Sequence, residues 1–285
     1  MQKSSEKYTD PRVLAHWYAS DFTRRSIQGV EYHHVRTEAG GDLFLTQFGL
    51  PFAVHLHPDN WFSNAWFDKH RRRLRGTSAI YQTETREIRG RTLQLVVRFS
   101  RVGEDLPIDT LTRDQHTHAA FNTPFEEFAE LMALRASRFG PKRQYIATKR
   151  PLAIYAPANR LELWQTGRSE SLIAAKQARM PEFELDILRP YVLVYGWIRG
   201  LDVQDVADRS GIGGATRKAL LTGPIEEVER ELQQAGFRVL DMKPAHIIIR
   251  FDSKGQLRRR KNGRLVYALV DYELLERDPA AQSSP

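Results

Sequence analysis

The sequence contains no cysteine, and this absence excludes disulfide bonds, thiolate metal sites and a cysteine nucleophile. A chain without cysteine suits a reducing compartment, so we expect a cytoplasmic protein. Long apolar runs are missing as well, because the longest, residues 191–198, is far shorter than the roughly 20 residues of a membrane-spanning helix. The N-terminus is polar. Neither secretion nor a membrane partner is therefore predicted.

The overall composition is typical of a folded protein of enzyme size, because 41% of the 285 residues are hydrophobic and 27% are charged. The formal net charge is +8, which is compatible with nucleic acid, anionic lipid or an acidic protein as a partner. A solvated basic surface is the alternative, because no nucleic-acid motif accompanies the charge. The basic residues gather in Lys69–Arg75, in Gly140–Arg143 with Thr148–Arg150, and in Leu257–Arg264.

Hydrophobic periodicity predicts strands and helices in an order that indicates the α+β class. Helices are expected at residues 11–24, 124–139 and 171–179, and helical segments are expected after Gly200, of which 224–235 is the clearest. Strands are expected at 78–85, 92–99, 151–156, 160–165 and 191–198, with a hairpin around 39–41. A second hairpin is expected from 246–251 and 264–272, flanking a basic turn.

The segment from Gly236 to Ile249 contains Asp241, Lys243 and Pro244, followed by an apolar strand. This pattern resembles the catalytic loop of eukaryotic-like protein kinases, Asp-x-Lys-Pro-x-Asn, with His246 in place of the Asn. The resemblance implies that Asp241 orients or deprotonates an acceptor hydroxyl and that Lys243 reaches the transferred phosphoryl group.

A second motif, Leu269–Glu273, places Asp271 at the end of an apolar strand and resembles the Asp-Phe-Gly of kinases. The resemblance implies a nucleotide, ATP, with Mg²⁺ or Mn²⁺ held by Asp271 and His246. Imidazole is a poor ligand for Mg²⁺ and a better one for Mn²⁺ or Zn²⁺. Either the preferred metal differs from that of kinases, or the second metal site is lost.

The nucleotide-binding parts of a kinase have altered counterparts earlier in the chain. Gly76 and Ser78 lie where the Gly-rich loop would cover the phosphates, although only the first glycine of that loop is present. Arg98 stands where a strand lysine would hold the phosphates, with Glu127 as its helix partner and Glu130 as the alternative. The remaining counterparts are Tyr195 and Trp197, which resemble the hinge that meets adenine.

The resemblance predicts a two-lobed protein-kinase-like fold. Residues 1–73 would be an N-terminal extension packed on the first lobe. Residues 74–198 would be that lobe, an antiparallel sheet with one helix, and 199–285 a much reduced helical second lobe. The resemblance ends at Asp278, seven residues before the end of the sequence. The helices with which a protein kinase holds a peptide substrate are therefore not expected.

Two functional hypotheses follow. The first is an atypical kinase-like ATP-binding phosphotransferase that acts on an unknown protein or small-molecule acceptor. The second is a catalytically impaired pseudokinase, a scaffold or regulatory module whose basic surface contacts a polyanion. A nucleic-acid-associated factor that binds through Arg258, Arg259 and Arg260 is a third alternative.

Each candidate residue also has a structural interpretation. Asp241, Lys243 and Asp271 would then form a buried ion-pair cluster that pins a loop, while Arg98 and Glu127 would be solvated. The histidine pairs lack a third metal ligand, so we interpret them as surface or packing residues. They are His55 with His57, which we expect on one face of a strand, and His116 with His118.

Overall fold

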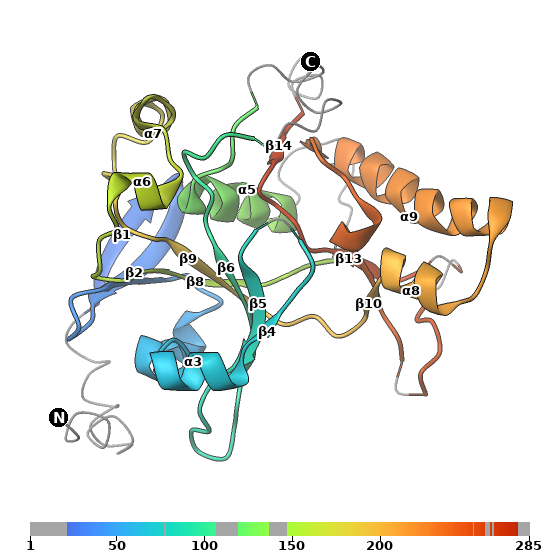
Figure 1. Cartoon of the computed structure of the whole chain (residues 1–285), viewed down its shortest axis with the longest axis horizontal. Helices are drawn as coiled ribbons and strands as arrows, with labels where there is room; N and C mark the ends of the chain where they lie inside the picture. Colours follow the sequence, from blue (N-terminus) through green and yellow to red (C-terminus); the bar gives the residue numbers. More distant parts are fainter. Residues whose placement is uncertain are drawn as a thin grey trace. The chain divides into compact units, whose positions relative to one another are not determined.

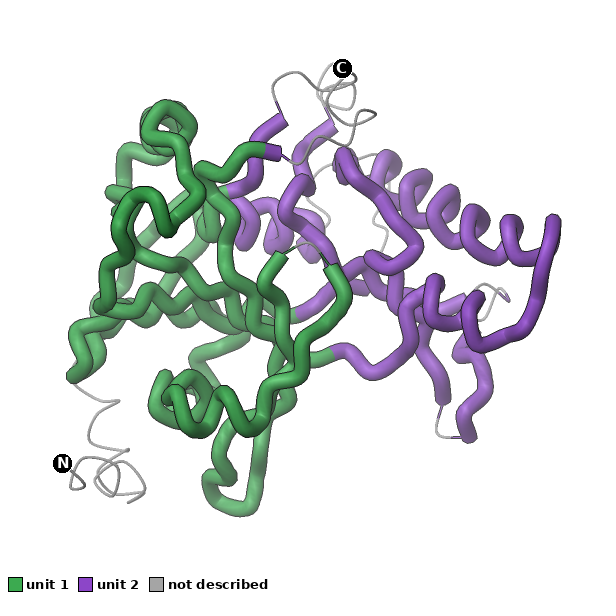
Figure 2. Tube along the Cα trace, in the orientation of Figure 1, with its two compact units in different colours: residues 1–105, 123–125, 150–197 green, residues 106–122, 126–149, 198–285 purple. Residues whose placement is uncertain are grey.

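The computed structural model describes residues 22–76, 78–106, 119–136, 147–252, 254–259, 263 and 265–278. The chain divides into two compact units that alternate along the sequence (Figure 2). Unit 1 comprises residues 1–105, 123–125 and 150–197, and unit 2 comprises residues 106–122, 126–149 and 198–285. The fold is α+β, as predicted. None of the described helices is both long and apolar enough to cross a membrane.

Unit 1 is built on a sheet whose described strands are all antiparallel, in the order β1-β2-β3-β8-β9-β6-β5-β4 (Figure 1). The predicted hairpin at residues 39–41 is confirmed, because it joins two paired strands of this sheet. The strands are β1 (Thr23–Ile27), β2 (Val30–Arg36), β3 (Asp42–Leu45), β4 (Arg72–Arg73), β5 (Ile80–Glu84), β6 (Gln94–Phe99), β8 (Pro151–Ala156) and β9 (Val192–Gly196).

One face of this sheet carries the main apolar core. Alternate residues of β6 and β9, Leu95 and Val97 with Val192 and Val194, are fully buried there. Each such side chain contributes roughly 1.5–3 kcal/mol by its burial. Trp61 is also fully buried in this core, and its indole N–H donates to the Leu56 carbonyl at 2.9 Å. The segments that supply the covering side chains are η1 (Leu50–Phe52), α2 (Ala53–Leu56), η2 (Pro58–Asn60) and α3 (Asn64–His70).

The opposite face of the sheet carries an aromatic cluster on the neighbouring strands β2 and β3. Tyr32 and Phe44 meet at 6.2 Å between ring centroids, and both lie edge-on to Phe125, at 5.5 and 5.3 Å. Phe125 is the second residue of helix α5 (Pro124–Ala136), whose predicted start is confirmed. Edge-to-face pairs of this kind stabilise a core beyond the area that they bury.

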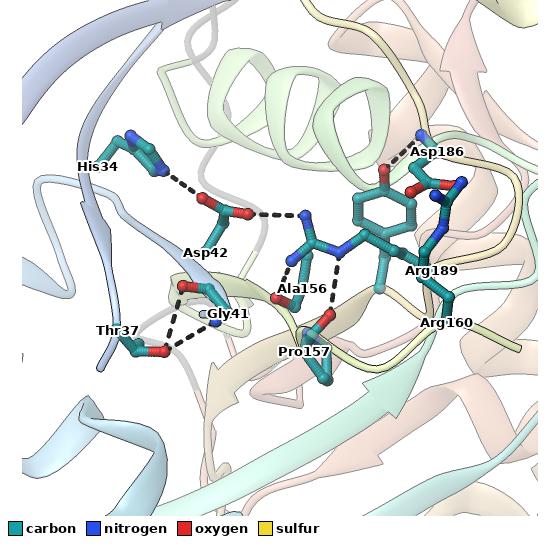
Figure 3. A network of polar contacts seen from close by, with 10 residues as sticks. His34, Thr37, Gly41, Asp42, Ala156, Pro157, Arg160, Asp186 and Arg189 are labelled. Atoms are coloured by element: carbon teal, nitrogen blue, oxygen red, sulfur yellow. Dashed lines mark hydrogen bonds and ion pairs between the residues drawn. The ribbon is translucent and has the colours of Figure 1, made fainter. Parts of the chain in front are cut away.

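A polar network joins the same part of the sheet to the segment before β9 (Figure 3). The Asp42 carboxylate contacts His34 Nε2 at 2.9 Å and Arg189 at 2.7 Å. Arg189 also donates from Nε to the Pro157 carbonyl at 2.9 Å. Burial by itself would raise the pKa of Asp42, but the hydrogen bonds from His34 and Arg189 outweigh it and hold that pKa below its ordinary value.

The strand predicted at residues 160–165 is wrong. This segment forms the short helix α6 (Leu163–Thr166), and β8 pairs with β3 and β9 instead. A capping box explains the difference, because the Gln165 side chain accepts from the Glu162 N–H at 2.8 Å and closes a helical turn. The next helix, α7 (Glu170–Ala178), confirms the prediction for residues 171–179.

Unit 2 contains most of α5, a small sheet in the order β10-β12-β13-β7, and the antiparallel pair β11-β14. Its second predicted hairpin is confirmed, because β12 pairs antiparallel with β13, although both strands are shorter than expected. The strands are β7 (Ala147–Thr148), β10 (Leu201–Asp202), β11 (Phe237–Val239), β12 (Ile247–Ile249), β13 (Tyr267–Leu269) and β14 (Leu275–Arg277).

The long helical part of unit 2 follows Gly200, where helical segments are expected. The helices are α8 (Val203–Arg209), α9 (Gly214–Gln234) and the single turn η3 (Pro244–His246). The predicted start at Pro224 is wrong, because α9 begins at Gly214 and continues through the proline. The helix predicted at residues 11–24 lies almost wholly outside the described residues, and its last two positions begin β1.

Candidate functional site

The loop after β11 carries the first pair of candidate residues in unit 2. Lys243 Nζ contacts Asp241 Oδ2 at 2.6 Å, and the two side chains are 45% and 31% exposed. The turn η3 follows directly and leads the chain into β12. The sequence motif therefore folds locally, with a carboxylate and an ammonium group that solvent can reach.

The second pair, His246 and Asp271, is brought together by the hairpin. Ile247 pairs with Leu269, so the residue before β12 and the residues after β13 lie at the same end of the ladder. The Val270 N–H donates to the His246 carbonyl at 2.9 Å. His246 Nε2 lies 3.2 Å from Asp271 Oδ2. Antiparallel register thus joins two motifs that are separated by the basic turn.

These side chains do not form a buried cluster. Asp241, Lys243 and Asp271 are each about a third or more exposed, and His246 is 17% exposed. An ion-pair cluster that pins a loop from inside the core would be closed to solvent. The interpretation of these residues as a buried structural cluster is therefore wrong, and an incoming ligand can reach them.

The contact between His246 and Asp271 is compatible with a shared metal ion. Two ligands that lie about 2.1 Å from one ion are separated by about 3.0–3.4 Å at octahedral or tetrahedral angles, and the contact atoms here are 3.2 Å apart. Within the described ranges no group of three or more histidines or acidic residues is placed to hold a metal. Phosphate oxygens or water would have to complete the coordination.

Tyr272 anchors the segment that carries Asp271. Its hydroxyl accepts from the Lys149 backbone N–H at 2.8 Å and donates to the Leu269 carbonyl. Burial raises the pKa of this phenol. Asn122 fixes the same segment from its other side, because its side-chain amide donates to the carbonyls of Tyr272 and Leu275, at 3.3 and 2.8 Å.

Lys149 is a residue that the sequence did not identify. We expected it in a solvated basic cluster, but it is 3% exposed and its ammonium lies 5.4 Å from the Tyr272 ring centroid. That expectation is wrong for Lys149. Its position follows from β7, which pairs in parallel with β13, and a two-residue strand of this kind has no periodic signal in the sequence.

The candidate phosphate loop in unit 1 forms the turn between β4 and β5, which are antiparallel. Gly76 has a φ of +143°, a conformation that only glycine adopts readily. Ser78 is buried just before β5 begins. The phosphate-binding role of Gly76 and Ser78 stays a prediction.

Arg98 lies on β6, on the sheet face opposite the apolar core. It pairs with Ile80 of β5, while Val96 two residues earlier pairs with Tyr195 of β9. Because strand residues alternate, these four side chains share one face. Arg98 is only 5% exposed, so its interpretation as a solvated residue is wrong. Alternation along the predicted strands would have identified Ile80 and Val96 as its apolar neighbours.

The candidate hinge lies at the end of β9. The N–H of Gly196 donates to the Arg150 carbonyl at 3.1 Å, and the N–H of Trp197 donates to the Gln94 carbonyl at 3.0 Å. Both donors are therefore used within the sheet. The last segment of unit 1 ends at Trp197, and the role of Tyr195 and Trp197 as a hinge stays a prediction.

The two candidate acidic residues of α5, Glu127 and Glu130, differ in their surroundings. Glu130 contacts Arg277 Nε at 3.1 Å, and burial raises the pKa of this carboxyl despite the arginine. Glu127 is 1% exposed, so its interpretation as a solvated first-turn acid is wrong. Glu127 belongs to unit 2 and Arg98 to unit 1. Their pairing stays a prediction.

Of the histidines interpreted as packing or surface residues, His55 and His57 lie in the described part of the chain, and both contact backbone groups. His55 lies in the short helix α2 rather than on a strand, and its Nε2 is 3.3 Å from the Arg91 carbonyl. His57 is buried and accepts at Nδ1 from the Asp59 N–H at 3.3 Å. His116, His118, Gly140–Arg143 and Arg260 lie outside the described residues.

No protein-family model matches the sequence, and no curated protein matches it. Solved structures of the bifunctional kinase-methyltransferase WbdD are similar in part. One is 13% identical, covers 67% of this chain and 31% of its own, and has a TM-score of 0.28. A co-crystal structure with a kinase inhibitor is 14% identical, with coverages of 73% and 36% and the same TM-score. Monomeric WbdD is 13% identical, with coverages of 95% and 47% and again a TM-score of 0.28. The chain thus spans less than half the length of these structures.

Proposed function

We propose that this protein is an atypical kinase-like phosphotransferase that uses ATP and a divalent metal. The observation that carries the proposal is the register of the β12–β13 hairpin, which places His246 beside Asp271 immediately after the loop that holds Asp241 and Lys243. Phosphoryl transfer requires an anionic base, a cation and metal-binding oxygens within one small region. Unit 2 supplies all three types of group in one short segment and its hairpin partner.

Each residue would have a distinct role. Asp241 would accept the proton of an acceptor hydroxyl, and Lys243, already 2.6 Å from it, would stabilise charge on the transferred group. Asp271 and His246 would hold the metal, which when bound neutralises phosphate oxygens. Tyr272 and Asn122 would keep the Asp271 segment in place. The acceptor is an unidentified protein or small molecule.

Unit 1 would supply the nucleotide-binding face. We assign residues 1–73 to an extension of the first lobe, 74–198 to that lobe and 199–285 to the second. Ile80, Val96 and Tyr195 share the sheet face of Arg98, and the kinase resemblance would place a nucleotide against this face. Because Val96, Tyr195 and Arg98 are each at most 5% exposed, binding would require the side chains over them to move. Because the N–H groups of Gly196 and Trp197 are used within the sheet, adenine would bond a carbonyl or a later donor.

Thermal unfolding with ATP and either Mg²⁺ or Mn²⁺ tests the metal site. A ligand at 100 times its Kd stabilises a protein by about 2.7 kcal/mol, so we expect a clear rise in Tm that Asp271→Asn abolishes. His246→Asn restores an amide oxygen and should shift the preference from Mn²⁺ toward Mg²⁺. Asp208→Asn, which removes a surface carboxylate of unit 2, should leave the rise unchanged. No rise with either metal would refute the proposal.

A pseudokinase is the second candidate, and one observation favours it. Lys243 pairs with Asp241, and His246 contacts Asp271, so each of the four side chains has a partner without a ligand. Hydrolysis of ATP, measured as phosphate release, separates the two functions. Turnover that is lost in Asp241→Asn and kept in Asp208→Asn would establish the enzyme. Nucleotide binding without turnover in the unaltered protein would establish the scaffold.

A further inference from the structure

A second feature of unit 1 concerns a different ligand. The chain passes directly from the C-terminus of α3 into β4, and five exposed cations lie along this passage. We call them the α3–β4 basic surface: Lys69, Arg71, Arg72, Arg73 and Arg75. Residues 64–94 contain eight lysines and arginines against three acidic residues. β4 is an edge strand of the large sheet, and charge on an edge also discourages aggregation.

The arginines of this surface are held in place, which protection of an edge does not require. Arg71 lies with its guanidinium carbon 5.1 Å from the ring centroids of both Phe67 and Tyr81. Arg73 lies 5.3 Å from the Tyr81 ring and donates to its hydroxyl at 3.3 Å. Arg72 donates to the Gln82 side chain at 2.7 Å. Preorganised side chains lose less conformational entropy when they bind a ligand.

The positive charge is only partly neutralised. Arg71 forms an ion pair with Asp68 at 2.7 Å. The contacts of Arg72 and Arg73 are with neutral groups, and in the described part of the chain neither has a carboxylate within ion-pair distance. Two oriented guanidinium groups on the edge strand therefore keep their full charge.

The aromatic rings near this surface already have guanidinium or imidazole groups on them. Arg71 and Arg73 lie over Tyr81. The Trp66 ring has the Arg86 guanidinium 4.7 Å from its centroid and stacks on the His70 ring at 3.7 Å. Single-strand-binding proteins use open ring faces to stack bases. Because these rings are engaged, a nucleic acid would be contacted here through its phosphates.

We propose that the α3–β4 basic surface binds the phosphodiester backbone of a nucleic acid without regard to sequence. Arginine favours this ligand because its planar fork bonds phosphate oxygens bidentately. A membrane is disfavoured, because the large apolar side chains that are exposed in the described residues, Leu163, Trp164, Ile212 and Leu257, lie on other segments. The inference does not depend on the proposed phosphotransfer.

Fluorescence anisotropy with labelled oligonucleotides, single-stranded and duplex, tests the proposal. The logarithm of the association constant falls with the logarithm of salt concentration, by about 0.7 per phosphate contacted on a single strand and about 0.9 on a duplex. Arg72→Gln with Arg73→Gln should therefore reduce the slope by about 1.4 or 1.8. A decrease of about 1.4 with the single-stranded oligonucleotide, or of about 1.8 with the duplex, identifies which of the two the surface binds.

The matched control removes the same charge elsewhere. Arg24→Gln with Arg25→Gln alters two exposed arginines of β1, the edge strand on the other side of the same sheet, and should leave the slope unchanged. An equal reduction in this variant would overturn the proposal, because the effect would then be one of net charge. Equal binding of anionic lipid vesicles or of polyglutamate, or affinities that differ strongly between homopolymers, would overturn it as well.

A second variant keeps the test valid if the glutamine variant folds poorly. Arg72→Lys with Arg73→Lys preserves the charge and removes the guanidinium fork. We expect an unchanged salt slope and weaker binding than in the unaltered protein. Binding as tight as that of the unaltered protein would refute the role assigned to the oriented guanidinium groups.

Discussion

Removal of the Tyr272 hydroxyl should destabilise the protein. This hydroxyl accepts from the Lys149 N–H at 2.8 Å and donates to the Leu269 carbonyl, and the residue is 1% exposed. In Tyr272→Phe both bonds are lost, and a backbone N–H in a buried region loses this acceptor. An unsatisfied buried donor costs about 1–3 kcal/mol. We therefore expect the free energy of unfolding to fall by about 2 kcal/mol.

The same deletion at Tyr32 should have the opposite or no effect. Tyr32 is 0% exposed, and its hydroxyl has no hydrogen-bond partner among the described residues. Burial raises the pKa of this phenol. Its ring packs edge-on against Phe44 and Phe125, contacts that Tyr32→Phe retains. Deletion of an unsatisfied hydroxyl removes a desolvation cost, so the free energy of unfolding should stay equal or rise.

Urea unfolding of the two variants, followed by tryptophan fluorescence and far-UV circular dichroism, measures both effects. Each substitution deletes one oxygen from a buried ring, so transfer of apolar area contributes almost equally and only the hydrogen bonds differ. The urea midpoint should fall in Tyr272→Phe and stay equal or rise in Tyr32→Phe, at constant m-value. Equal losses in both variants, or no loss in Tyr272→Phe, would refute the reasoning.

Two further predictions concern acid stability and backbone strain. Because hydrogen bonds from His34 and Arg189 hold the pKa of Asp42 below its ordinary value, its stabilising contribution is present above the unfolded pKa of about 3.9 and disappears as the pH falls through the folded pKa. Asp42→Asn should therefore lower the urea midpoint at neutral pH. If the difference in midpoint between the variant and the unaltered protein did not decrease in acid, the hydrogen bonds of the Asp42 carboxylate would not be its cause. Gly200 has a φ of +157°, and an added Cβ would lie 2.3 Å from a backbone carbonyl of β12. Gly200→Ala should lower the free energy of unfolding by more than the roughly 1–3 kcal/mol of backbone strain alone. Gly211→Ala, with a φ of +65° and open space around the added Cβ, should lower it only by the strain. Equal decreases in Tm for the two variants would contradict a steric clash at Gly200.

Local patterns predicted the elements whose signals agree with one another. The strands expected at 78–85 and 92–99 require a turn between them, and there Arg89 and Gly90 have φ values of 52° and 71°. The strand prediction for residues 160–165 was wrong because Leu161 and Leu163 alternate as in a strand. The capping box instead favours a helix, in which Trp164 is 81% exposed. The proline at 224 suggested a helix start, but the helix begins ten residues earlier at Gly214.

The candidate site shows the same division between local and distant signals. Asp241, Lys243, His246 and Asp271 could be identified because each lies in a short motif with recognisable order. Lys149 could not be identified, because its neighbour Tyr272 is far along the chain and the two meet only through the pairing of β7 with β13. The burial of Arg98 likewise depends on strands β5 and β9, which flank it in the sheet.

The parallel pairing of β7 with β13 also has a consequence for the order of folding during synthesis. The described strands of the large sheet all precede residue 197, so this sheet can assemble before residues 198–285 of unit 2 have been synthesised. Strand β7 can pair with β13 only after Tyr267–Leu269 has been synthesised. The Asp271 segment leaves the ribosome just after this strand, so the candidate metal site forms among the last parts of the described chain.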